Sequence, residues 1–294
     1  MYSRNFESIM INFHANIRSW ARKNPRLKSI LNIPYEWILH TGWWFRSRVL
    51  HSPFELDIGR HRIKLWPIGS IARPLYYGGF ELSDRKFVMA YLKSGMRVVD
   101  AGANIGLYTV MASILTGPTG QVYAFEPGIK TFNRLQRNLR LNDCQNVIPN
   151  NVALSNTCGE MILRVDPKHP TFDAHCFVDS LDDAKEINPT DEIVKCKTLD
   201  NYNLGPLDFI KIDVEGGELA LLQGALQTLK NSPDVTILLE CTNNRKQVRD
   251  FLERQGFLSY LWDDKEYTLR STLFEEATVT SNIVLRRQPL NNIF

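Results

Sequence analysis

The chain has 294 residues, of which 44% are hydrophobic and 23% charged, so it can form a sizeable globular core and is not a disordered protein. Its formal net charge of +3 is too small to indicate a nucleic-acid-binding protein. The charge is uneven, because residues 1–75 carry twelve Lys and Arg against four Asp and Glu, a net charge of +8. We therefore expect this N-terminal segment to meet an anionic partner.

The five cysteines are scattered and odd in number, without a Cys-x-x-Cys spacing. This argues against a disulfide framework and a zinc site, and it favours a reducing compartment. The N-terminus has no continuous apolar region of the signal-peptide type, and no apolar run reaches the ~18 residues that span a bilayer. We expect a cytoplasmic protein without a transmembrane segment.

Residues 1–75 are expected to form a helical and hairpin extension. Short helices, separated by residues that interrupt a helix, are predicted over residues 5–50. Residues 54–65 then alternate in polarity around Ile58-Gly59-Arg60, which predicts a β-hairpin.

Two interpretations are open for residues 30–48, which contain Trp37, Trp43 and Trp44. The three tryptophans could pack as a helical cap over the core. Alternatively, they could lie at the headgroup depth of a membrane, with Arg46 and Arg48 on lipid phosphates, as a peripheral contact. The lack of a clean amphipathic face favours the cap.

From Gly95 onward, short buried strands alternate with helices. Strands are expected at 96–100, 121–125, 147–148, 208–212 and 235–239, and helices at 105–115, 130–141, 219–229 and 246–255. This predicts an α/β fold over residues 76–294: a Rossmann-like, doubly wound sheet of seven strands, mostly parallel, with an antiparallel C-terminal pair at 257–262 and 283–286. The segment at about 158–190 interrupts the alternation, either as a surface loop or as a substrate-facing insertion.

The first of these strands runs into a glycine loop, Asp100-Ala101-Gly102-Ala103-Asn104-Ile105-Gly106. Gly102 lets the backbone pass close to a ligand, and Gly106 does the same at the first helical turn, where free N–H groups favour an electron-rich ligand. Asp100 lies at the carboxyl end of its strand, where open α/β sheets bind ligands, and its anion suits the ammonium group of a methionyl moiety.

The next strand ends in Phe125-Glu126-Pro127. Glu126 follows Gly106 by 20 residues. An acidic side chain at this sequence separation can accept hydrogen bonds from both ribose hydroxyls. Asn104 stands where a dinucleotide-binding loop has its middle glycine, so the loop suits a nucleoside without phosphate. Asp143, after the second helix, is a further candidate on the adenine side.

A third motif, Lys211-Ile212-Asp213-Val214-Glu215-Gly216, ends a buried strand beside the glycine loop. Ionisable groups at such a position are costly unless paired, which makes Lys211, Asp213 and Glu215 candidate catalytic residues. Asp213 is the first candidate for a general base and Glu215 the second; His169 and His175 are weaker candidates. Alternatively, Glu215 and Glu218 only cap the next helix, and Lys211 pairs with one of them.

These motifs in this order, together with Thr198-Leu199-Asp200 and Tyr77-Gly78-Gly79-Phe80-Glu81, resemble the FkbM family of methyltransferases over about Tyr76 to Val284. The resemblance implies a class I methyltransferase fold with S-adenosylmethionine as the methyl donor. It further implies O-methylation of a hydroxyl on a sugar, glycolipid or polyketide-type metabolite.

For such a reaction the protein must position the acceptor oxygen and exclude water, and a base must accept the hydroxyl proton. A divalent metal on Asp213, Glu215 and Glu240 is the less favoured alternative, so no metal ligand is assigned. The expected partner is a small-molecule, glycan or lipid alcohol, and not a nucleic acid.

Two other functions compete. A nicotinamide-dependent oxidoreductase is disfavoured by Asn104 in the glycine loop. A protein that has lost catalysis and serves as a binding scaffold is disfavoured because Asp100, Glu126 and Asp213 are all present.

Overall fold

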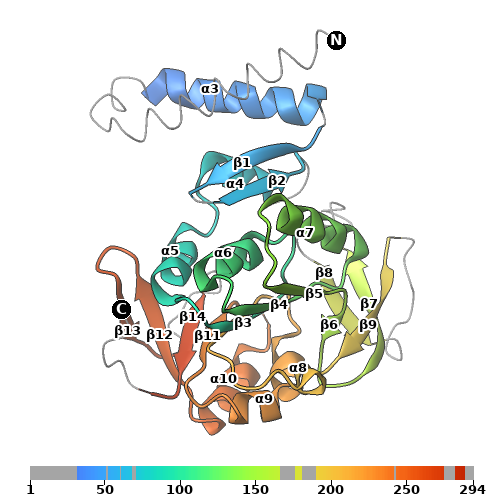
Figure 1. Cartoon of the computed structure of the whole chain (residues 1–294), viewed down its shortest axis with the longest axis vertical. Coiled ribbons are helices and arrows are strands. Elements are labelled where there is room, and N and C mark those ends of the chain that lie inside the picture. Colours follow the sequence, from blue (N-terminus) through green and yellow to red (C-terminus); the bar gives the residue numbers. More distant parts are fainter. Residues whose placement is uncertain are drawn as a thin grey trace. The chain divides into compact units, whose positions relative to one another are not determined.

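The computed structural model describes residues 32–50, 52–59, 61–67, 71–165, 176–180, 190–241, 243–274 and 282–288 (Figure 1). The chain divides into two compact units. Unit 1 comprises the described parts of Met1–Phe54 together with Leu65–Phe80, and unit 2 comprises those of Glu55–Lys64 and Glu81–Phe294. The helical pieces predicted before residue 32 lie outside the described residues, and a domain boundary at residue 75 stays a prediction.

Unit 1 contains helix α3 (Asn32–Phe45), the π-helical turn η1 (Arg46–Leu50) and helix α4 (Ala72–Tyr77). Its apolar centre includes Trp43, whose ring centroid lies 6.5 Å from that of Phe54 and 5.5 Å from that of Tyr76. The buried Arg46 places its guanidinium 4.6 Å from the Phe54 ring centroid. Among the helices described, none combines the length and the apolar character needed to cross a bilayer.

Strands β1 (Phe54–Ile58) and β2 (His61–Leu65) form the predicted hairpin. Residues 55–64 of this hairpin belong to unit 2. Two asparagines, one in helix α7 (Ile129–Leu141) and one at the C-cap of that helix, form hydrogen bonds with β2. Asn138 Oδ1 accepts from the Lys64 N–H at 2.7 Å, and Asn142 Oδ1 accepts from the Arg62 N–H at 2.8 Å. The side-chain amides thus replace a neighbouring strand along part of the β2 edge.

The main sheet of unit 2 has the order β13-β12-β14-β11-β10-β3-β4-β5. Its strands are β3 (Arg97–Ala101), β4 (Gln121–Phe125), β5 (Val147–Asn150), β10 (Phe209–Ile212), β11 (Thr236–Leu239), β12 (Leu258–Asp263), β13 (Thr268–Ser271) and β14 (Ile283–Arg286). The neighbouring pairs from β11 to β5 are parallel, whereas β14 runs antiparallel to both β11 and β12. The α/β class and the antiparallel C-terminal pair are confirmed.

The predicted count of seven strands is wrong, because β13 adds an eighth, antiparallel strand to β12. The turn between the two strands is fixed by Asp263, whose Oδ1 accepts from the N–H groups of Lys265 and Glu266 at 3.0 and 3.1 Å. Three of the four residues in β13 are exposed, so the strand has no apolar pattern that the sequence could reveal.

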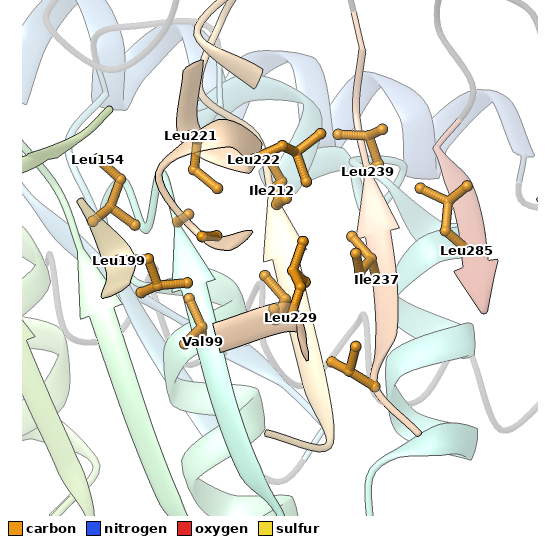
Figure 2. Packing of buried hydrophobic residues seen from close by; sticks show 14 of the residues in the cluster. Val99, Leu154, Leu199, Ile212, Leu221, Leu222, Leu229, Ile237, Leu239 and Leu285 are labelled. Atoms are coloured by element: carbon orange, nitrogen blue, oxygen red, sulfur yellow. The ribbon is translucent and has the colours of Figure 1, made fainter. Parts of the chain in front are cut away.

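Helices cover both faces of this sheet: α5 (Leu82–Tyr91), α6 (Leu107–Thr116) and α7 on one face, α8 (Glu218–Gln223), α9 (Leu226–Lys230) and α10 (Arg245–Arg254) on the other (Figure 1). Figure 2 shows the core on the second face, where strand residues such as Ile212 and Ile237 pack with Leu221 and Leu229. Because side chains alternate along a strand, Lys211 points to the opposite face, toward α6.

The helix expected at 219–229 is two helices, α8 and α9, separated at Gly224. A Cβ on Gly224 would lie 2.0 Å from the carbonyl oxygen of Ser155, so the chain passes closer there than another residue would permit.

The segment at about 158–190 contributes a hairpin to a second sheet of unit 2. This sheet has the order β6-β9-β7-β8, with β6 (Ala153–Leu154), β7 (Gly159–Val165), β8 (Cys176–Ser180) and β9 (Glu192–Lys197). The segment is therefore more than a surface loop. Residues 166–175 and 181–189, with the candidates His169 and His175, lie outside the described residues.

Candidate active site

The glycine loop after β3 is bonded to both neighbouring strands. The N–H groups of Gly102 and Ala103 donate to the Phe125 carbonyl at 3.0 and 2.9 Å, and the Asp213 N–H donates to the Ala101 carbonyl at 3.0 Å. Gly102 has a φ of +80°, and a Cβ there would lie 1.7 Å from the Asp213 carbonyl oxygen. The end of β10 therefore already excludes a side chain at Gly102, and an approach of the Gly102 backbone to a ligand stays a prediction.

Gly106 also has a role in packing. Its φ is +94°, and a Cβ would lie 2.6 Å from Leu135 Cδ1 of α7. Its own N–H donates to the Ala103 carbonyl at 2.9 Å. The sequence had suggested that this N–H is free for a ligand. In the structure it is already bonded within the loop.

Asp100 is 2% exposed and has two different carboxylate oxygens. Oδ2 accepts from the Thr109 hydroxyl of α6 at 2.6 Å. Oδ1 is buried and has no hydrogen-bond partner among the described residues. Burial raises the pKa of Asp100, and the Lys211 ammonium opposes that rise. One oxygen thus orients the carboxylate, and the other is left for a donor from a ligand.

Glu126 lies at the end of β4, next to Asp100 on β3. Its Oε2 accepts from the Asn104 N–H at 3.0 Å, and its Oε1 accepts from the Gly128 N–H at 2.9 Å. Burial raises the pKa of Glu126 to about 7, although both backbone donors lower it. Each carboxylate oxygen retains acceptor capacity for a hydroxyl. Asn104 has a φ of +50°, a left-handed conformation that asparagine tolerates at the position where a dinucleotide-binding loop has its middle glycine.

Asn151 holds the turn after Glu126 and was missed by the sequence reasoning. Its amide donates to the carbonyls of Glu126 and Pro127 at 2.9 and 2.7 Å. The signal that could have found it is its position directly after β5, whose carboxyl end lies beside that of β4.

The structure does not bring Asp143 to this pocket. Helix α7 begins after the carboxyl end of β4, and β5 then starts at Val147, opposite Val122 near the start of β4. Asp143 therefore lies at the amino edge of the sheet, where it accepts from Gln145 Nε2 at 2.6 Å. The adenine-side assignment of Asp143 is withdrawn for this reason.

Lys211 is 3% exposed and donates from Nζ to Asp213 Oδ2 at 2.7 Å. The same nitrogen lies 4.7 Å from the ring centroid of Tyr108 on α6. Burial lowers the pKa of Lys211, but the carboxylates of Asp213, Glu81 and Asp100 raise it more, so its pKa lies above the usual value. Lys211 is a buried cation paired to Asp213, not to Glu215 or Glu218.

Three carboxylates gather around this pair. Glu81, Asp213 and Glu240 each present an oxygen within 4.8 Å of the other two. Asp213 and Glu240 follow the parallel strands β10 and β11, and Glu81 precedes α5. Burial, reinforced by the Asp213 charge, raises the pKa of Glu240 to about 8, and burial also raises the pKa of Glu81. We call these three residues the acidic cluster.

Oxygen ligands of this kind suit a hard divalent cation. From the sequence, Asp213, Glu215 and Glu240 were considered as possible metal ligands. The structure instead brings Glu81 together with Asp213 and Glu240. The Lys211 ammonium lies against Asp213, so a buried positive charge is already present beside the cluster. The raised pKa values of Glu240 and Glu81 further reduce the negative charge of the cluster, so we assign no metal.

The two glutamates after Asp213 have different places. Glu218 is buried in the first turn of α8, and its Oε1 accepts from the Gly216 N–H at 2.8 Å, which matches a helix-capping role. Glu215 has a φ of +49° and lies near enough to Glu240 for its charge to raise the pKa of that carboxyl. The Asp213 charge also raises the pKa of Glu218, so both glutamates lie within electrostatic range of the acidic cluster.

A family model described as the methyltransferase FkbM domain matches residues 100–259. The match covers more than half of the chain and contains Asp100, Glu126, Asp213 and Glu240. The chain belongs to the FkbM methyltransferase family. The resemblance seen in the sequence motifs is thereby confirmed.

Relatives of this FkbM-family chain include named methyltransferases. It is 27% identical to methyltransferase sdnD of Sordaria araneosa over 67% of this chain and 86% of that protein. It is 28% identical to the hexuronic acid methyltransferase AglP of Haloferax volcanii over 52% of this chain and 59% of that protein. Methyltransferase 1 of Beauveria bassiana is 27% identical over 48% of this chain, and the match spans 63% of that protein.

Solved structures with a similar arrangement include the methyltransferase FkbM of Methylobacillus flagellatus. That likeness has 14% identity and a TM-score of 0.44, and it covers 74% of this FkbM-family chain and 55% of the other. A second is TYW2 of M. jannaschii in complex with AdoMet, with 16% identity, a TM-score of 0.39 and coverage of 80% and 84%. The fold assignment rests on the strand order given above.

Proposed function

We propose that this chain is an S-adenosylmethionine-dependent methyltransferase that acts on a hydroxyl oxygen. The observation that carries the proposal is the pair of acidic residues at the carboxyl ends of β3 and β4. Asp100 has a buried oxygen without a partner, and Glu126 is held by two backbone N–H groups. When bound, the cofactor supplies a methyl group activated on a sulfonium. Asp100 would hold its ammonium group, and Glu126 its ribose hydroxyls.

The proton of the acceptor hydroxyl needs a base beside this pocket. Asp213 is the first candidate from the sequence, but its carboxylate is bonded to Lys211. No described residue donates a hydrogen bond to the carboxylate of Glu240, and burial raises its pKa to about 8, so its ionised form is a good proton acceptor. We therefore assign proton acceptance to Glu240, with the Asp213–Lys211 pair contributing to its electrostatic surroundings.

The acceptor is proposed to be a hydroxyl on a sugar, glycolipid or polyketide-type metabolite. Support for the sugar class comes from AglP, which is named a hexuronic acid methyltransferase. In this reaction Glu240 would accept the acceptor proton as the methyl group passes from the sulfonium sulfur to the acceptor oxygen.

Calorimetric titration with S-adenosylhomocysteine and with NAD tests the cofactor assignment. We expect the first to bind and the second not to bind. NAD binding alone would refute the methyltransferase assignment, and binding of neither would point to a scaffold. Incubation with S-adenosylmethionine carrying a labelled methyl group, and with a panel of sugar, glycolipid and polyketide alcohols, should then show transfer of label to oxygen. The same incubation with a chelator should keep its rate if no divalent metal is needed.

A further inference from the structure

Helix α3 in unit 1 has two different faces. Trp43 packs against Phe54 and Tyr76, as the cap interpretation requires of a tryptophan. Trp37 and Trp44 are 67% and 59% exposed. They are seven residues apart, two helical turns, and so share one face. The cap interpretation therefore explains Trp43 and leaves two large indoles in solvent.

These two indoles border an open hollow of about 450 Å³ that also contacts η1 and α4. Arg48 of η1 and Arg73 of α4 line the hollow, and no Asp or Glu is among the described residues that do so. Neither arginine forms an ion pair with a residue that the structure describes. The Arg73 guanidinium lies 5.9 Å from the ring centroid of Tyr77. The hollow thus offers two guanidinium groups to an anion.

The sequence of unit 1 reinforces this local charge. The segments 1–54 and 65–80 contain nine Lys and Arg against two Asp and Glu, a net charge of +7. Val49 of η1 is also exposed, which adds apolar surface next to Arg48. A basic surface with exposed indoles and aliphatic groups is typical of segments that lie in the headgroup region of a membrane.

We propose that this face of unit 1 docks on the anionic headgroup layer of a phospholipid membrane. Trp37 and Trp44 lie at headgroup depth, and Arg48 and Arg73 contact lipid phosphates. An extended surface fits better than a small soluble anion, because a small-molecule site encloses most of its ligand whereas these indoles project outward. The proposal does not depend on the proposed methyl transfer.

Sedimentation of the full chain with vesicles tests the docking. The vesicles contain phosphatidylcholine alone or phosphatidylcholine with phosphatidylglycerol. We expect binding to the anionic vesicles, and a partition coefficient lowered about tenfold or more in Trp37→Ala/Trp44→Ala and in Arg48→Glu/Arg73→Glu. The control Lys195→Glu/Lys246→Glu changes net charge equally on exposed sites of unit 2 and should bind as the unaltered protein does.

Brominated lipids supply a second readout, because they quench indoles that reach the headgroup region. Quenching should be strong in the unaltered protein and nearly lost in Trp37→Ala/Trp44→Ala. Thermal unfolding verifies that each variant is folded, which is expected because the altered side chains are exposed or line an open hollow.

Several results would overturn the docking surface. One is absence of binding to anionic vesicles, and another is equal binding to neutral ones. A third is unaltered partition of both unit 1 variants. Free glycerophosphate that binds as tightly as the vesicles, and displaces them, would identify a soluble phosphate site instead of a membrane.

Discussion

The carbonyl oxygen of Asp213 lies 1.7 Å from the position that a Cβ would take at Gly102. The loop that faces the proposed nucleoside therefore touches the end of β10, which leads into Asp213 of the acidic cluster. The contact is reinforced by the hydrogen bond from the Asp213 N–H to the Ala101 carbonyl. Displacement of either segment must displace the other.

Gly102→Ala should disrupt this junction. The new methyl group collides with backbone, which cannot move as a flexible side chain can, so we expect a loss of about 3 kcal/mol or more in the free energy of unfolding. S-adenosylhomocysteine binding should fall with it. Gly95→Ala is the control, because Gly95 has a similar φ of +88° but its nearest contact is 3.8 Å; it should lose about 1 kcal/mol. Equal urea midpoints for the two variants would show that the collision is relieved without cost.

Glu126 should make nucleoside binding depend on pH. Burial raises its pKa from 4.5 to about 7, so the anion that accepts ribose hydroxyls forms only as the pH rises through that value. Affinity for S-adenosylhomocysteine, measured by calorimetry on either side of pH 7, should increase with pH. Glu126→Gln should bind at least about tenfold more weakly and lose the pH dependence. Exposed Glu160→Gln should leave both unchanged.

Glu126 should also make folding stability depend on pH, but in the opposite direction to nucleoside binding. Between its ordinary pKa of 4.5 and about 7, the folded protein holds the Glu126 proton that the unfolded chain has released. The contribution of Glu126 to the free energy of unfolding therefore decreases as pH rises across that window. Comparing urea unfolding of the unaltered protein and of Glu126→Gln isolates this contribution; parallel pH profiles would contradict the assignment.

Glu240→Gln should lower kcat by about a hundredfold with little change in S-adenosylhomocysteine affinity, because it removes the proton acceptor and leaves the nucleoside pocket intact. With an acceptor identified from the alcohol panel, the unaltered rate should rise with pH through about 8, the pKa of Glu240. In the variant this rise should disappear. A variant with normal kcat and the same pH profile would return the assignment to Asp213.

Lys211→Met should destabilise unit 2 by about 3 kcal/mol near neutral pH, because it leaves Asp213 and its neighbours without their buried counter-charge. The loss should shrink on acidification, since protonated carboxylates no longer repel one another. Urea unfolding at neutral and acidic pH measures both effects. If the loss of stability is the same at both pH values, Lys211 stabilises the protein through packing and not through its charge.

The parts of the site that follow a single strand were predictable from the sequence. Asp100, Glu126 and Asp213 each come directly after a short apolar run, and parallel strands bring such positions to one edge. From the sequence, Asn104 served only to disfavour a dinucleotide, and its left-handed conformation was not predicted.

Other parts depended on distant contacts. Glu81 precedes α5, a helix with a mixed pattern of charges, and only the folded chain brings it to Asp213. The adjacent strands β10 and β11 also bring Glu240 there, and its basicity arises from burial that the sequence does not show. Asp143 was misplaced because a helix that starts at one edge of a sheet ends at the other. The expected cytoplasmic location stays a prediction.

The asparagine contacts between α7 and the β1–β2 hairpin limit how the polypeptide can be shortened. A protein that begins after residue 75 would lack the strand that Asn138 and Asn142 bind. Without β2, the buried amide of Asn138 would lose its hydrogen bonds to the backbone of Lys64. A shortened protein that keeps these contacts must therefore retain residues 55–64, and unit 1 would have to be excised as two separate stretches instead of trimmed from one end.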